Sequence, residues 1–261
     1  MVKIFFYFPI LFAKYTRFKG LNGSLQFFFK YFMLVFLASV VHIQSFCLIR
    51  FIISIFYMYS LYEFGYIQND AETIKKENNP TKRLTNEDLA FYEKHKISIY
   101  VTRLGWVLLL ASFLMFSNTS CFFILYSIII VPVFYLYNTI RNRYNLYIHI
   151  ILMFLRLSVP VVISSLYIDF PLMLWILFIY PIPVFVQLSV KGKFGYKNKF
   201  FSRYIMFSYD KHNMHLFRIK YYIVFTLLLF IFCASGLMTW WYLLPTGYYF
   251  LFTILSAIKN L

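Results

Sequence analysis

Charged residues are scarce in this sequence, and acidic residues are the scarcest of them. Only 13% of the 261 residues are charged, nine of them acidic, whereas charged residues make up about a quarter of an ordinary soluble domain. In contrast, 62% of the residues are apolar or aromatic, and the mean hydropathy is +0.71. A chain of this composition cannot cover a water-exposed surface, which excludes a soluble fold and places most of the chain in lipid.

Cysteine is also scarce, and the three cysteines are far apart. Cys47, Cys121 and Cys233 lie in or beside apolar segments, so they suggest neither a disulfide framework nor the closely spaced ligands of a zinc site. The net charge of +16 is high, but its lysines and arginines lie in short loops between apolar runs. This pattern is typical of a membrane protein and predicts no nucleic-acid partner.

About eight apolar runs are long enough to cross roughly 30 Å of hydrocarbon as helices. They cover residues 24–42, 47–67, 97–116, 120–138, 147–166, 172–190, 218–236 and 240–258. The first apolar stretch, 4–13, is too short to cross, and we expect it to lie along the interface in a cytoplasmic N-terminal segment, 1–23. The sequence predicts an all-α polytopic bundle of eight or nine transmembrane helices, forming one domain over residues 1–261.

The loop cations predict the orientation of the bundle. Nearly all loop lysines and arginines fall in three loops, at 68–96, 139–146 and 191–217. Because short basic loops stay in the cytoplasm during insertion, these loops and both termini are predicted to be cytoplasmic. We expect a multi-pass protein of the inner (cytoplasmic) membrane of the cell, in contact with membrane lipids.

Six of the nine carboxylates lie between residues 70 and 93, in the first polar loop. Asp70 and Glu77 are separated by about 700° of helical rotation, so a helix that continued past Asp70 would present both on one face. Two such carboxylates suit Mg²⁺, which takes further oxygens from water and a substrate phosphate. Lys82 and Arg83 lie close by and can balance the charge of a diphosphate. A solvated helix end with i,i+4 charge pairs is the alternative explanation.

Two charged residues lie within apolar runs. Arg156 is near the middle of its run, where an unpaired cation costs about 2.5–3.5 kcal/mol on insertion scales. We therefore expect Arg156 to face a polar cavity or a partner. Glu63 lies about two helical turns before Asp70 and should also face the interior, where it orients a base or pairs with a buried cation.

At these residues the sequence resembles the UbiA superfamily of intramembrane prenyltransferases, whose second helix ends in a motif of the form NDxxDxxxD. Asn69 and Asp70 match its first two positions, and Glu77 matches the last acid conservatively, while Thr73 stands where the middle acid would be. The segment NPTKR, 79–83, is similar to the HPTKR segment of the polyprenyl-phosphate phosphoribosyltransferase-like branch.

Further similarities follow in the same order along the chain. YNTIRNR, which contains Arg141, resembles the end of the family's fourth helix, and FLRLSVP, which contains Arg156, resembles a segment of the fifth. The loop that begins with Lys191 and Lys193 is placed like the family's second polar loop. Prenyltransferases of the family carry a second acidic motif there, whereas this loop is basic and its only acid is Asp210.

The resemblance implies a transferase that uses Mg²⁺ to move a prenyl or phosphoribosyl group from a diphosphate donor to a lipid or aromatic acceptor. The loops at 68–96 and 191–217 would form the mouth of its active site. Asn69, Asp70 and Glu77 would be catalytic, with Asp70 and Glu77 as the metal ligands. The diphosphate would be bound by Lys82, Arg83, Arg141, Arg156, Lys191 and Lys193. The alternative is a non-catalytic or transport-type membrane protein that retains the fold, which Thr73 and the missing second acidic motif favour.

Overall fold

Helices account for all the regular structure in the part of the chain that the structure describes. This computed structural model describes residues 3–42, 44–76, 81–140, 142–192, 195 and 197–258. Eight helical stretches are long and apolar enough to cross a membrane. They are Gly20–Val40, Leu48–Lys75, Asn86–Phe116, Cys121–Thr139, Asn145–Ser165, Phe170–Lys191, Lys211–Ala234 and Trp240–Ile258. Each contains most of one predicted run, so the prediction of an all-α polytopic bundle is confirmed.

Several spans are built from two or three shorter helical elements, where η denotes a short 3-10 or π segment. The elements are η1 (Ile4–Phe6), α1 (Leu11–Thr16), α2 (Gly20–Phe27), η2 (Phe28–Phe32), α3 (Met33–Val40), α4 (Leu48–Ala71), η3 (Thr73–Lys76), α5 (Asn86–Phe116), α6 (Cys121–Ile128), α7 (Ile130–Thr139), α8 (Asn145–Ser165), α9 (Phe170–Ile179), α10 (Pro181–Lys191), η5 (Phe201–Ile205), α11 (Lys211–Ala234), η6 (Trp240–Tyr242) and α12 (Leu243–Ile258).

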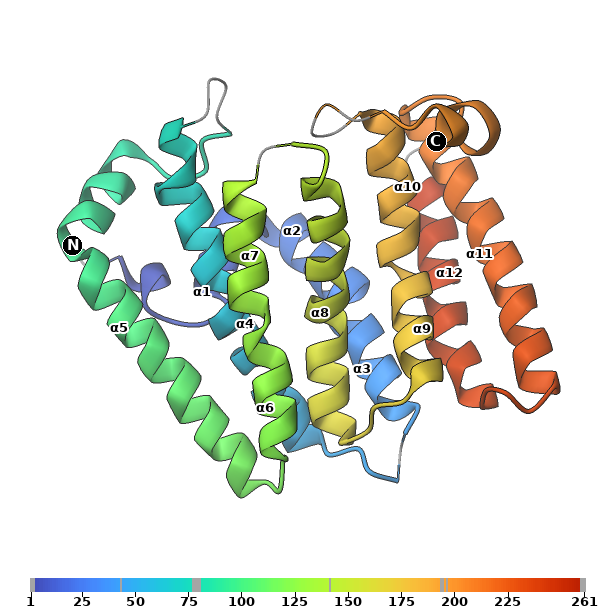
Figure 1. Ribbon diagram of the computed structural model, residues 1–261, viewed down its shortest axis with the longest axis horizontal. Coiled ribbons are helices and arrows are strands. Elements are labelled where there is room, and N and C mark those ends of the chain that lie inside the picture. Colours follow the sequence, from blue (N-terminus) through green and yellow to red (C-terminus); the bar gives the residue numbers. More distant parts are fainter. Residues whose placement is uncertain are drawn as a thin grey trace.

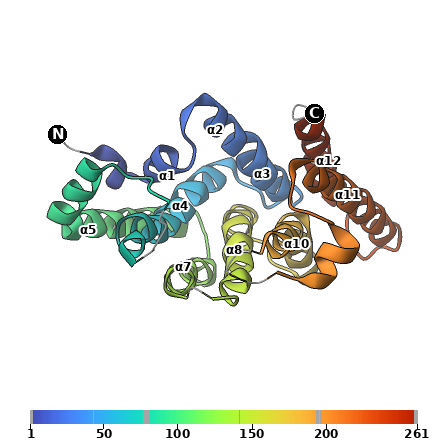
Figure 2. The same cartoon turned by 90° about the horizontal axis from the view of Figure 1, so that it is seen from above.

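The helices α4 and α8 occupy the centre of the bundle. In each of these two spans, 61% of the 18-residue apolar stretch is buried, compared with 22% in the spans of α5 and α11. Seen from above in Figure 2, α5 and α11 lie at opposite sides of the molecule, and α4 and α8 lie between them. The outer helices α5 and α11 carry many exposed leucine, isoleucine and phenylalanine side chains. In a bundle whose solvent is lipid, such side chains face the acyl chains.

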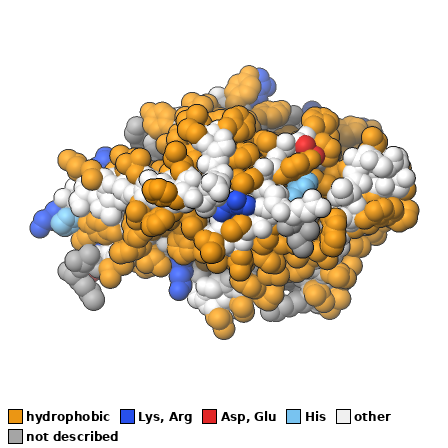
Figure 3. Space-filling model, turned by 90° about the horizontal axis from the view of Figure 1, so that it is seen from below, with side chains coloured by type: hydrophobic (Ala, Val, Ile, Leu, Met, Phe, Trp, Pro, Cys, Tyr) orange, Lys and Arg blue, Asp and Glu red, His pale blue; other side chains and the backbone are white. Residues whose placement is uncertain are grey.

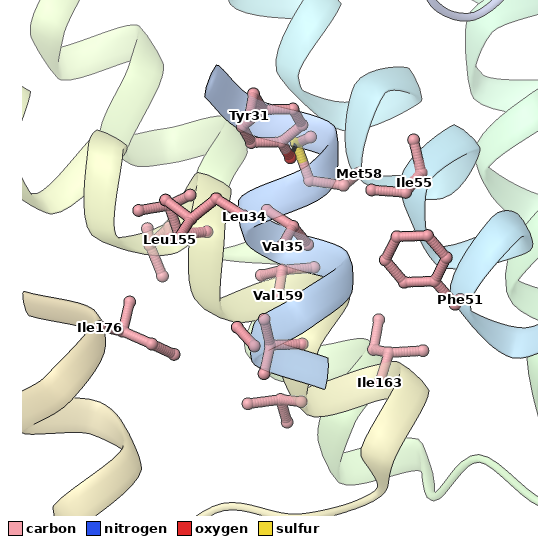
Figure 4. Packing of buried hydrophobic residues seen from close by; sticks show 14 of the residues in the cluster. Tyr31, Leu34, Val35, Phe51, Ile55, Met58, Leu155, Val159, Ile163 and Ile176 are labelled. Carbon is pink, nitrogen blue, oxygen red and sulfur yellow. Dashed lines mark hydrogen bonds between the residues drawn. The ribbon is translucent and has the colours of Figure 1, made fainter. Parts of the chain in front are cut away.

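The central packing is made by α3, α4 and α8. Figure 4 shows α3 between α4 and α8, with Val35 on α3, Ile55 on α4 and Val159 on α8 among the side chains that fill the space. All three side chains are buried. Because α8 is apolar around most of its circumference, it can be surrounded by other helices.

The two ends of the bundle differ in polarity. The α4–α5, α7–α8 and α10–α11 connections, which are the three basic loops, lie at the same end, the top of Figure 1. The opposite end, seen from below in Figure 3, is mainly hydrophobic, with few charged side chains. The predicted alternation of basic and uncharged connections is therefore present in the structure, and a cytoplasmic position for the basic end remains a prediction.

The N-terminal segment packs into the protein through η1 and α1. Phe6 and Phe12 are fully buried in a cluster that also contains residues of α4 and α5. Buried contacts of this kind differ from the expected helix resting along the membrane interface. The segment therefore belongs to the folded bundle, and it delivers Arg17, the residue after α1, to the polar end.

Candidate functional site

A cavity of about 470 Å³ lies among the central helices, toward the polar end of the bundle. Its lining comes from α2, η2, α4, α7, α8 and α10, from the α1–α2 and α9–α10 junctions, and from the loop before α5. Four of the lining residues are cations, namely Arg17, Lys30, Arg83 and Arg156. Among the residues that the structure describes, no carboxylate lines the cavity. The cavity is thus suited to an anion.

Two breaks in the helices shape the cavity wall. The span Gly20–Val40 passes through a π segment, η2, which contains the lining residues Lys30 and Tyr31. Local π geometry of this kind is frequent at functional sites, since it turns side chains away from their regular helical positions. On the other side, the span Phe170–Lys191 breaks at Tyr180, because Pro181 cannot donate the next helical hydrogen bond. Tyr180 then lines the cavity.

Arg156 is a cation in the cavity wall and has no acidic partner among the residues that the structure describes. Its Nη2 donates a hydrogen bond to the Tyr59 hydroxyl at 2.5 Å. Its guanidinium carbon lies 4.5 Å from the ring centroid of Tyr31 and 5.4 Å from that of Tyr62, within the range of a cation–π interaction. Its Nε is buried and has no hydrogen-bond partner within the described part of the chain. No described carboxylate forms an ion pair with Arg156.

Asp70 lies behind the cavity lining and bonds to two of the arginines that line the cavity. The carboxylate is only 1% exposed. Arg17 donates two hydrogen bonds to it, at 2.5 and 3.0 Å, Arg83 donates one at 3.2 Å, and the Asn69 amide donates one at 3.0 Å. The Arg17 guanidinium also stacks over the Tyr66 ring, 4.3 Å from its centroid. One carboxylate therefore holds two arginines together at the cavity.

The position of Arg17 depends on a second buried carboxylate, Glu63 of α4. Glu63 accepts hydrogen bonds from the backbone N–H groups of Ile10 and Ala13, at 3.0 and 2.6 Å. It thereby satisfies amide groups at the start of α1 that have no partner within the helix. The charge of Glu63 is balanced by an ion pair with Arg103 of α5, and both side chains are fully buried. This network fixes α1, and with it Arg17, against α4.

No protein-family model, curated protein or solved structure matches this chain. The resemblance to the UbiA superfamily therefore stays a prediction that rests on the motifs of this sequence.

The structure brings together four of the residues that the sequence indicated. Asn69, Arg83 and Arg156 line the cavity, and Asp70 lies directly behind the first two. The expectation that Arg156 faces a polar cavity is confirmed. Glu63 pairs with a buried cation, which was one of its two expected roles.

Two other indicated residues, Lys82 and Lys191, lie outside the cavity lining. Lys82 is exposed and lies outside the lining. Lys191 packs over the ring of Tyr209, 5.0 Å from its centroid, and is also outside the lining. Glu77, Arg141 and Lys193 lie outside the described residues.

The expected alignment of Asp70 and Glu77 on one helical face required α4 to continue as far as residue 77. The helix ends at Ala71, and a 3-10 segment follows. Side-chain contacts accompany this turn: Glu72 accepts hydrogen bonds from Tyr92 and Lys96 of α5, at 2.9 and 2.5 Å. These contacts hold Glu72 against α5 at the point where the chain leaves α4.

The sequence analysis did not predict the roles of Arg17 and Lys30 in the cavity, or that of Arg103 as the partner of Glu63. Arg17 is 53 residues from Asp70 along the chain, and nothing in the sequence pairs the two. Arg103 carries a signal that could have been used, because it is a lone cation inside an apolar run, as Arg156 is. An intramembrane cation calls for a partner, and Glu63 is an intramembrane acid in need of one.

Proposed function

We propose that this protein is a membrane transferase that binds a diphosphate-activated donor in the cavity and transfers the donor's organic group to a membrane acceptor. The observation that carries the proposal is Arg156, a cation in the cavity wall without an acidic partner among the described residues. An uncompensated charge in such a place is unfavourable. An anionic ligand would supply the missing partner.

The remaining cations support a ligand with more than one negative charge. Arg17, Arg83 and Lys30 line the same cavity as Arg156. Arginine presents a planar set of donors that matches phosphate oxygens, and lysine acts as a point charge. In the proposed reaction, the bond between the donor carbon and the diphosphate oxygen breaks, and its electron pair stays on the oxygen. The cations stabilise the charge that develops there, while the acceptor atom forms the new bond and loses its proton.

The apolar part of the lining favours a prenyl group over a phosphoribosyl group. Phe27, Leu152, Met153 and Leu157 all line the cavity. A prenyl chain could be buried against such side chains, whereas the hydroxyl groups of ribose would each need a hydrogen-bond partner. A lipid or aromatic acceptor would reach the same space from the membrane.

The expected location is the inner (cytoplasmic) membrane. The cavity lies toward the end of the bundle that carries the basic loops. If that end is cytoplasmic, the charged head of the donor would enter from the compartment in which soluble diphosphates are made, while its chain remains in the bundle.

Diphosphate release from purified protein in lipid vesicles tests the proposal. Prenyl diphosphates of several chain lengths and phosphoribosyl diphosphate would be supplied with a total membrane lipid extract as acceptor. We expect release with at least one prenyl diphosphate, and a loss of at least 100-fold in Arg156→Gln, about 2.7 kcal/mol of transition-state stabilisation. Lys94→Gln is the matched control, because Lys94 is an exposed cation on α5 outside the cavity.

The proposal fails if no donor releases diphosphate, or if Arg156→Gln retains the wild-type rate. A non-catalytic membrane protein with the same bundle is the second candidate. The hydrogen bonds to Asp70 favour it, since they hold this carboxylate outside the cavity lining, against two arginines and away from a proton on an acceptor bound in the cavity. Donor binding without release of diphosphate would identify this second candidate.

A further inference from the structure

The hydrogen bonds of Asp70 bear on how a diphosphate would be held. A carboxylate offers about four lone-pair sites in total. Asp70 accepts four hydrogen bonds, two from Arg17, one from Arg83 and one from Asn69. Oδ1 accepts three of these bonds, one each from Arg17, Arg83 and Asn69, and Oδ2 accepts the fourth, from Arg17. Both oxygens therefore contact protein donors, and three of the four bonds come from cations.

This arrangement does not fit a magnesium ligand. Mg²⁺ requires oxygen atoms at about 2.0–2.1 Å in near-octahedral geometry. A magnesium ion on Oδ1 would have to displace a donor, and one on Oδ2 would lie next to the Arg17 guanidinium. Elsewhere in the described residues, no group of three or more His, Cys, Asp and Glu side chains is placed to hold a metal. The described residues thus do not provide the Mg²⁺ site that the motif implies, and that prediction depends on Glu77.

The charge of the cavity matches a diphosphate without a metal. Four cations line the cavity, and Asp70 is the one carboxylate bonded to them among the described residues, which leaves a net charge of about +3. A diphosphate group carries about three negative charges near neutral pH. An added Mg²⁺ would leave about two positive charges uncompensated in a partly buried site, which is unfavourable.

We infer that the cavity binds the diphosphate group directly through Arg17, Arg83, Arg156 and Lys30, without a divalent cation, and that Asp70 is a positioning residue for two of these arginines. The inference rests on the proposed function for the class of donor. It concerns binding alone, so it can fail while the proposed function stands.

Binding of inorganic diphosphate to the purified protein in neutral detergent tests the inference. Calorimetric titrations would be performed in EDTA and in excess MgCl₂ with wild-type protein. We expect the affinity in EDTA to lie within threefold of the affinity in MgCl₂. In EDTA, Arg156→Gln should weaken binding at least tenfold, while Lys94→Gln should leave it unchanged. A thermal unfolding scan of each variant establishes that it is folded.

The outcomes separate the inference from the proposed function. Binding that is lost in EDTA and restored by MgCl₂ overturns the inference and leaves the transferase proposal standing. The absence of binding under both conditions overturns both. Should Arg156→Gln fail to fold, Lys30→Gln, which removes another cation from the lining, replaces it, and unchanged affinity in that variant also counts against the inference.

Discussion

Glu63 and Arg103 form an ion pair between α4 and α5 in which both side chains are fully buried. Each partner also holds the N-terminal segment: Glu63 accepts from the backbone of Ile10 and Ala13, and Arg103 donates to the carbonyl oxygens of Phe5 and Phe6, at 3.0 and 2.8 Å. The pair thus joins three parts of the chain. Its hydrogen bonds satisfy backbone groups that would otherwise be buried without partners.

Replacement of Arg103 by Met should destabilise the protein by about 3–5 kcal/mol, because it leaves the Glu63 carboxylate buried and without its countercharge. Thermal unfolding in detergent would measure the loss. The double variant Glu63→Gln/Arg103→Met should recover part of it, since no uncompensated charge remains and Gln can still accept one backbone hydrogen bond. If Arg103→Met is as stable as the wild-type protein, the ion pair contributes little to stability.

The lengths of the apolar runs were sufficient to identify all eight spans, because the thickness of the bilayer limits those lengths. They could not locate the helix ends. Helix α5 begins at Asn86, well before its apolar run, because Thr85 and Asp88 form a capping box outside the membrane-length segment. Helix α11 begins early for a similar reason, with Asp210 as its N-cap.

The cavity was predictable only in part. Arg156 could be assigned to it because a cation inside an apolar run must face something polar. Arg17 could not, because its place at the cavity follows from the folding of a short N-terminal segment between two helices. Asp70 was predicted to be a metal ligand, and in the structure its partners are Asn69 and two arginines. A motif of acidic residues suggests metal binding, but cations elsewhere in the fold can pair with the same carboxylates. The motif alone does not reveal those cations.

A close approach between α4 and α7 gives a second prediction. A Cβ atom on Gly65 would lie 2.1 Å from Cγ of Phe134, which is far inside any contact distance. Phe134 lines the cavity and is itself buried. We expect Gly65→Ala to destabilise the protein by about 1–3 kcal/mol through overpacking, as measured by thermal unfolding.

Two matched variants make this prediction specific. Gly105→Ala should be neutral or slightly stabilising, because nothing lies within 4 Å of a Cβ at that helical position and alanine is the better helix former. Phe134→Leu should partly restore the stability of Gly65→Ala by removing the ring that the methyl group meets. Equal effects of the two glycine substitutions would contradict the packing argument.

The orientation of the bundle gives a third prediction. In a variant with its native cysteines replaced by serine, single cysteines at Asn86 and Lys197 should react with a membrane-impermeant maleimide only after the cytoplasmic face is opened. A cysteine retained at position 121 should react from the other side, because Cys121 is exposed and is the first residue of α6, a helix that lies toward the opposite end of the bundle. If position 86 or position 197 is labelled in intact cells, the predicted orientation is wrong.

Arg17 gives the last prediction, because it lines the cavity and was not predicted from the sequence. Its guanidinium makes a two-point contact with Asp70, which lysine cannot reproduce with a single ammonium group. In EDTA, Arg17→Gln should weaken the binding of inorganic diphosphate about tenfold, or about 1.4 kcal/mol. Arg17→Lys should have an intermediate effect, since it keeps the charge and loses the planar geometry.

Lys14→Gln is the control that separates a direct contact from general attraction. Lys14 is an exposed cation on α1, close to Arg17 in the sequence but outside the cavity lining. If the net charge of the N-terminal segment merely attracts anions, both Gln variants should weaken binding equally, and raising the salt concentration should abolish the difference from wild type. If Arg17 contacts the diphosphate, Lys14→Gln should match the wild-type protein, and the effect of Arg17→Gln should persist in salt, because a partly buried contact is screened less than an exposed one.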